Sequence, residues 1–85
     1  MASYKVLYWQ EIPSQVRVED ESTDLSIELP QKFMARIDAM AAERGLSAAD
    51  DYLAQWHWSE EEEREGTAQD VADAVVRELE AKSDW

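Results

Sequence analysis

The sequence has no cysteine and, among its 85 residues, only two glycines and two prolines. Without cysteine the chain can form neither disulfide bonds nor a thiolate metal site. The glycine-rich loops that bind nucleotide phosphates are also excluded, because Gly45 and Gly66 are too far apart to form one. A single domain over residues 1–85 must therefore depend on its apolar core, and this length is near the lower limit for that.

A basic leader and long apolar runs are missing as well. The first residues, MASYKVLYWQ, contain no basic segment followed by an apolar stretch, which argues against a secretory signal. No apolar run approaches the roughly 20 residues that a membrane-spanning helix needs. We therefore expect a cytoplasmic protein that does not enter the membrane.

Positive charge is scarce. Eight Lys and Arg residues oppose twenty Asp and Glu residues, which gives a net charge of −12. Such a chain repels the phosphates of nucleic acids and of anionic membranes, so we expect no direct binding to nucleic acid. The charge can serve solubility, attract a basic protein partner or mimic nucleic acid, and composition alone does not choose among these.

Alternation of apolar and polar residues predicts four short strands. The second and third are expected to form a hairpin through the polar turn at residues 20–24. Pro13 lacks an N–H group and restricts Ile12 to extended geometry, so we expect the first strand to stop or kink there. The predicted strands are Tyr4–Gln10, Val16–Glu19, Leu25–Leu29 and Ala54–Trp58.

The most regular pattern predicts a helix that begins near Pro30. Arg44 would complement the helix dipole in the last turn. Gly45 can take the left-handed conformation that ends a helix, with Leu46 folding back onto it. The apolar stripe expected to face the sheet consists of Phe33, Ile37, Met40 and Ala41.

A second long helix is expected after Gly66, where Thr67 and Asp70 resemble a capping box. Ser47 is expected to cap a shorter helical segment over residues 47–53. At the other end of the chain, residues 81–85 should fray unless Trp85 docks. The apolar stripe of the second long helix consists of Val71, Ala74, Val75 and Leu79.

These elements predict an α+β fold: a small, mostly antiparallel sheet of three to four strands with two main helices packed on one face. The helices should cover either the face that carries Val6 and Tyr8 or the face that carries Leu7 and Trp9. The second face would remain open to water or to a partner.

Few residues suit catalysis or metal binding. His57 is the only histidine, and no nucleophile motif surrounds any serine. The acidic run Glu60–Glu63 could attract a hard cation, but consecutive carboxylates repel one another and favour solvent. We therefore expect no catalytic residue, no metal and no cofactor. An enzyme or small-ligand-binding protein, with its substrate against Trp9 or Trp56, is kept as an alternative.

A regulator is the other alternative. Residues 25–47 resemble the strand and first helix of a ribbon-helix-helix repressor, whose strand enters the DNA major groove. Ser26 and Glu28 would then face the groove without any Lys or Arg, and the net charge opposes DNA binding. A DNA-mimic regulator belongs to the same alternative.

A partner-binding surface is predicted around the stretch LYWQEIPSQV. Aromatic and amide side chains next to each other offer both apolar area and orientation, and Trp and Tyr are enriched at interface hot spots. Ile12 has no reason to occupy a solvated turn, so it should either tuck under the sheet or meet another molecule. The predicted set, placed at one edge of the sheet, is Trp9, Gln10, Ile12, Pro13, Gln15, Trp56 and Trp58.

Four segments together resemble the small bacterial family named virulence factor, and VLYWQEIPSQV is the most specific part. Related domains occur beside HEAT-like repeats in conserved virulence factor proteins, which implies an interaction module. The resemblance carries no catalytic residue. We therefore expect a non-catalytic protein-interaction module or accessory subunit of a bacterial cytoplasmic complex, with a homodimer as a variant. The segments are YKVLYWQEIPSQV (4–16), LPQKFMARID (29–38), YLAQWHW (52–58) and EGTAQDVADAVVRELE (65–80).

Overall fold

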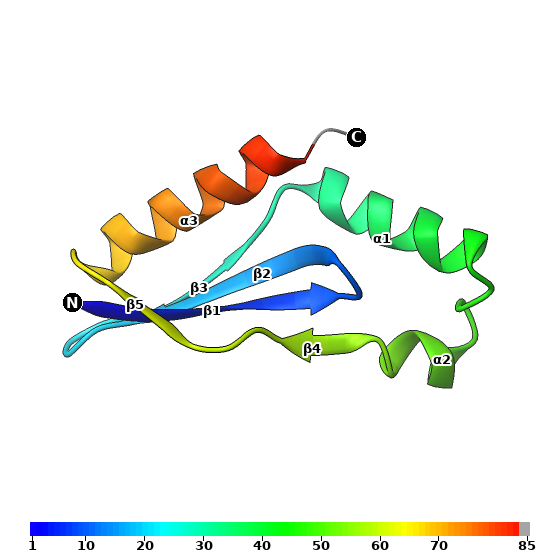
Figure 1. The fold of residues 1–85 in the computed structure, drawn as a ribbon, viewed down its shortest axis with the longest axis horizontal. Helices are drawn as coiled ribbons and strands as arrows, with labels where there is room; N and C mark the ends of the chain where they lie inside the picture. The colour runs from blue at the N-terminus through cyan, green and yellow to red at the C-terminus, as the bar shows by residue number, and fades with distance from the viewer. Residues whose placement is uncertain (84–85) are drawn as a thin grey trace.

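The fold is built around β1 (Ala2–Trp9), a central strand paired antiparallel on both edges. The computed structural model describes residues 1–83, over which the chain forms a five-stranded sheet and three helices (Figure 1). This confirms the predicted α+β fold. Whether Trp85 docks concerns a residue outside the described part of the chain. The other elements are β2 (Ile12–Glu19), β3 (Asp24–Glu28), α1 (Gln31–Glu43), α2 (Ala49–Leu53), β4 (Trp56–Trp58), β5 (Glu62–Arg64) and α3 (Ala68–Lys82).

The strands lie in the order β3-β2-β1-β4, and β5 pairs with the same edge of β1 as β4, nearer its start. Between β4 and β5, Ser59 keeps this edge of β1 hydrogen-bonded. Its N–H donates to the Val6 carbonyl at 2.8 Å, and its hydroxyl accepts from the Val6 N–H at 2.9 Å. The predicted hairpin between β2 and β3 is confirmed, with Glu19 opposite Asp24 across the turn.

The first strand was expected to stop or kink at Pro13. It ends earlier, at Trp9, and Pro13 belongs to the next strand. β1 turns directly into β2 through Gln10 and Glu11, and Gln10 has a left-handed φ of 53°. Pro13 lies opposite Tyr8, next to an irregularity where the pairing register shifts. Proline can occupy a strand at a bulge, because the disturbed ladder does not need its missing N–H.

The two long helices lie on the same side of the sheet (Figure 1). They cover the face of Val6 and Tyr8, which settles the choice between faces: Val6 is buried, and Tyr8 is half-buried against the core. All four residues of the predicted α1 stripe are buried. On α3, Val71 and Val75 are buried, whereas Ala74 and Leu79 are half-buried.

The end of α1 follows the prediction. Gly45 has φ 68°, and the Leu46 N–H donates to the Ala41 carbonyl at 2.8 Å, which is the Schellman arrangement. Arg44 lies at the C-cap, just beyond the last turn, and pairs with Glu11. The predicted short helix is present as α2, but the predicted cap was wrong, because the N-cap is Ala48 instead of Ser47 and no side chain caps it.

The start of α3 is held by three side chains, those of Thr67, Asp70 and Asp20. The predicted capping box is present: the Thr67 hydroxyl accepts from the Asp70 N–H at 3.2 Å. In addition, the Asp20 carboxylate accepts from the Ala68 N–H at 2.8 Å and from the N–H groups of Ser22 and Thr23. These backbone donors lower the pKa of Asp20. The turn between β2 and β3 is thereby joined to the helix.

The acidic run differs from its prediction in one respect. Glu60–Glu63 are all exposed, as expected, but Glu62 and Glu63 belong to β5 and pair with β1. At the end of this strand, Arg64 bonds to Glu78 of α3 at 2.6 Å, which lowers the pKa of the Glu78 carboxyl group. A strand forms here because backbone pairing at an edge leaves its charged side chains in water.

Added salt is expected to raise the melting temperature. Among residues 1–83 there are three ion pairs, all at the surface, against a net charge of −12. Exposed pairs contribute little, whereas screening relieves repulsion among the many remaining carboxylates. Thermal unfolding followed by circular dichroism between about 10 mM and about 0.3 M NaCl tests this. A melting temperature that falls steadily with salt would show that the ion pairs outweigh the repulsion.

Candidate functional site

The sheet brings the predicted partner-binding residues to one end of β1. Trp9 lies opposite Ile12 on β2 and opposite Trp56 on β4. One step away Pro13 faces Tyr8, and Leu7 lies between Gln15 and Trp58. The expectation that the stretch would come within reach of the Trp pair is therefore confirmed, although β1 and β2 are inner strands of the sheet.

Two members of this set are core residues. Trp9 is 0% exposed and Ile12 is 3% exposed. The Trp9 indole N–H donates to the Tyr52 carbonyl of α2 at 2.9 Å, and the two rings lie 5.6 Å apart. The prediction that Trp9 and Ile12 contribute side chains to a partner surface was wrong, because Trp9 packs against Tyr52 of α2 and both side chains belong to the core.

Gln10 is occupied within the chain. Its amide nitrogen donates to the Gln55 side-chain oxygen at 3.0 Å, and its amide oxygen accepts from the Arg44 guanidinium. Arg44 also bonds to Glu11 at 2.8 Å, which lowers the pKa of that carboxyl group. Gln10 thus joins the hairpin turn to the ends of α1 and α2. Partner binding through it stays a prediction.

Of the remaining candidates, Gln15 and Trp58 lie on the sheet face that α1 and α3 leave uncovered, on either side of Leu7. On this face Trp58 is 43% exposed, and the Lys5 ammonium lies 4.8 Å from the centroid of its ring. A hollow of about 210 Å³ adjoins Lys5 and Arg17. We call this surface the open face and define it by Lys5, Leu7, Gln15, Arg17 and Trp58.

Sequence reasoning missed three members of the open face: Lys5, Leu7 and Arg17. The signal was present, because residues 5 and 7 alternate with the buried Val6 and must point away from it. What the sequence did not supply was the register that places Leu7 opposite Trp58. Pro13 and Trp56 are both half-buried and do not belong to the open face. Pro13 lies opposite Tyr8 on the helix-covered side of the sheet, and Trp56 packs against the core.

His57 lies on the opposite side of β4 from Trp58. Its exposed ring stacks on Tyr8, with centroids 5.8 Å apart, and Nδ1 lies 3.4 Å from the Gln55 carbonyl. Within residues 1–83 no hydrogen bond joins this ring to a carboxylate, and no three His, Cys, Asp or Glu residues are grouped to hold a metal ion. Nor does that part of the chain contain a helix of the length and apolarity needed to cross a membrane.

The segment that resembles a ribbon-helix-helix repressor folds differently. Its strand, β3, pairs with β2 of the same chain. Its helix, α1, is followed by the five-residue α2 and by β4. In a repressor of that class the strand would pair across a dimer and a second long helix would follow. The arrangement of these residues therefore disfavours that alternative.

Comparison with known proteins gives one match. The sequence model of a family described as Virulence factor covers residues 7–84. No curated protein and no solved structure matches the chain. The match includes every residue of the open face except Lys5.

Proposed function

Since this chain belongs to the virulence factor family, we propose that it is a non-catalytic protein-interaction module or accessory subunit of a bacterial cytoplasmic complex. The family match confirms the resemblance seen in the sequence, and the family name associates the protein with virulence. The name specifies no reaction. The proposal is supported chiefly by one observation: a sheet face left uncovered by the helices carries a half-exposed tryptophan.

The open face has the composition of a recognition surface. Trp58 is 43% exposed on a strand, beside the half-buried Leu7. Tryptophan is the residue type most enriched at interface hot spots, because it buries a large area with few rotatable bonds. Lys5 over the ring and Gln15 across β1 add polar groups that can orient a partner.

The charges around the open face favour a basic partner. Lys5 and Arg17 are its cations, and Arg17 is already paired with Asp24 at 2.9 Å. The carboxylates whose strand positions place them on the same side of the sheet outnumber these cations, so the face carries a net negative charge. Charge complementarity of this kind speeds association and selects among partners. The surrounding carboxylates are Glu19, Asp24, Glu28 and Glu63.

Replacing Trp58 with alanine is expected to weaken partner capture by about thirtyfold, the effect of losing a typical hot-spot tryptophan. The measurement is a pull-down from lysate of the host bacterium, with the retained protein identified by mass spectrometry and its affinity then measured with purified material. Circular dichroism should show an unchanged fold, because the side chain is half-exposed.

The matched control is His57→Ala, which removes an exposed ring from the neighbouring position on the opposite face of β4. The His57→Ala protein should capture the partner as well as the unaltered protein does. Equal capture by the Trp58→Ala protein and the unaltered protein, with the fold intact, would rule out the open face. Recovery of only the chain itself, together with dimers in light scattering, would favour the homodimer, and turnover of a bound metabolite would favour an enzyme.

A further inference from the structure

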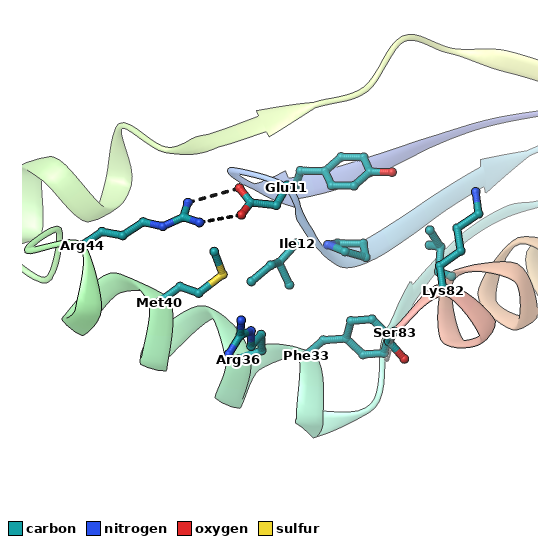
Figure 2. A pocket seen from close by; sticks show the side chains of 11 residues that line it. Glu11, Ile12, Phe33, Arg36, Met40, Arg44, Lys82 and Ser83 are labelled. Carbon is teal, nitrogen blue, oxygen red and sulfur yellow. Dashed lines mark hydrogen bonds and ion pairs between the residues drawn. The ribbon is translucent and has the colours of Figure 1, made fainter. Parts of the chain in front are cut away.

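A second concave surface lies on the helical side of the sheet, away from the open face. It is a cavity of about 360 Å³ between the β1–β2 hairpin, α1 and the end of α3 (Figure 2). Its apolar lining includes Ile12, Phe33 and Met40, which belong to the hydrophobic core. The volume falls within the range of small-molecule sites, which are mostly apolar with a few polar groups.

Positive charge gathers at this cavity. Arg36, Arg44 and Lys82 line it, which is three of the eight basic residues in a chain of net charge −12. Glu11 is the one carboxylate among its described lining residues, and it is paired with Arg44 (Figure 2). Arg36 and Lys82 therefore leave the cavity with a positive charge that the rest of the surface does not share.

Arg36 has a buried donor that is not satisfied. Its Nε is shielded from solvent and has no hydrogen-bond partner among residues 1–83. Buried polar groups in folded proteins are nearly always hydrogen-bonded, so each exception needs an explanation. The planar guanidinium is well suited to a carboxylate, and a ligand oxygen that turns this side chain toward the cavity would give the N–H its partner.

We propose that this cavity binds an amphipathic organic acid, a small molecule whose carboxylate pairs with Arg36 and Lys82 while its apolar body lies against Ile12, Phe33 and Met40. The charge and the apolar lining are both required by this arrangement. A hydrophobic molecule without charge would leave Arg36 unsatisfied, and a small hydrophilic anion would leave the apolar lining in water. The site is independent of the open face and of the function proposed for it.

The test is a titration followed by isothermal calorimetry and by amide chemical shifts, with decanoate as the probe. Decanol has the same chain without the charge, and acetate has the charge without the chain. Decanoate should bind saturably and shift the amides around Ile12, Phe33 and Met40. Decanol should bind at least about tenfold more weakly, since a hydrogen bond to a charged group contributes a factor of that order. Acetate should also bind at least about tenfold more weakly, because it lacks the apolar chain whose burial stabilises the complex.

Arg36→Gln should weaken decanoate binding by about tenfold or more, for the same reason. The matched control is Arg77→Gln, which removes the same charge from an exposed position of α3 that does not line the cavity. The affinity of the Arg77→Gln protein for decanoate should be unchanged. Lys82→Gln changes an exposed residue that also lines the cavity, and it serves as the test if Arg36→Gln lowers stability.

Three results would overturn the proposal. In the first, decanol binds as tightly as decanoate. In the second, the chemical shift changes lie away from the cavity. In the third, Lys82→Gln and Arg77→Gln lower the affinity equally, which would mean that net charge alone attracts the probe.

Discussion

Replacing Trp9 with alanine is expected to lower the free energy of unfolding by about 3–5 kcal/mol, the usual range for truncating a large buried aromatic side chain. Trp9 is 0% exposed, so its removal leaves a cavity in the core. It also removes the indole N–H that bonds to the Tyr52 carbonyl, so that this acceptor keeps only the Gln55 N–H as a donor. Urea denaturation followed by circular dichroism measures the change.

Trp58→Ala is the matched control, because it removes the same side chain from a position that is 43% exposed. Its cost should stay within about 1 kcal/mol, as for most surface changes. Equal losses in the two variants would contradict the placement of Trp9 in the core. Any loss of partner capture in Trp9→Ala would report unfolding rather than a lost contact.

The second large effect is expected at Phe33, where alanine should cost about 2–5 kcal/mol, and Ile37→Ala should fall in the same range. Phe33 is 1% exposed and Ile37 is 0% exposed, so both fix α1 to the sheet. The loss combines transfer of apolar surface to water with the cavity left behind. Chemical denaturation of the purified variants provides the values.

Met34→Ala is the control on the same helix, since Met34 is adjacent to Phe33 but 36% exposed. Its cost should be clearly smaller than that of either core variant. If the losses at Phe33 and Ile37 were both within experimental error, α1 could not be packed against the sheet through these two side chains.

The long helices were the most predictable elements, for a physical reason. A helix that covers a sheet needs apolar residues at helical spacing, and that pattern is local in the sequence. Phe33 and Ile37 could therefore be identified as core residues before the fold was known. The left-handed Gly45 and the Thr67 cap were predictable in the same way, because each depends on residues within one turn of the helix.

The hairpin at Gln10 could not be predicted from local signals. Turns of this kind usually carry Gly, Asn or Asp, whereas here Gln10 adopts the left-handed conformation itself. Its amide is held by Gln55 and Arg44, which are remote in the sequence. β5 was not predicted, because nothing in a run of glutamates indicates that the backbone of this run pairs with β1.

The candidate site could be predicted only in part, because it also depends on contacts between residues that are remote in the sequence. The residues around Trp9 were correctly expected to meet Trp56, but which of them faced solvent depended on contacts with α2, such as the bond from the Trp9 indole to the Tyr52 carbonyl. The open face depends on strand register. The cationic cavity depends on three segments that meet only in the folded chain, so no single stretch of sequence indicates it.

The two edges of β1 have different consequences for the order of folding. β2 is reached through a short turn, whereas the bond between Val6 and Ser59 joins residues 53 positions apart. Closing the longer loop costs more chain entropy, so we infer that the hairpin forms early and that the C-terminal segment is added late. Until then one edge of β1 can pair with a strand of another molecule. The strong negative charge then has a second effect, because it keeps incompletely folded chains apart.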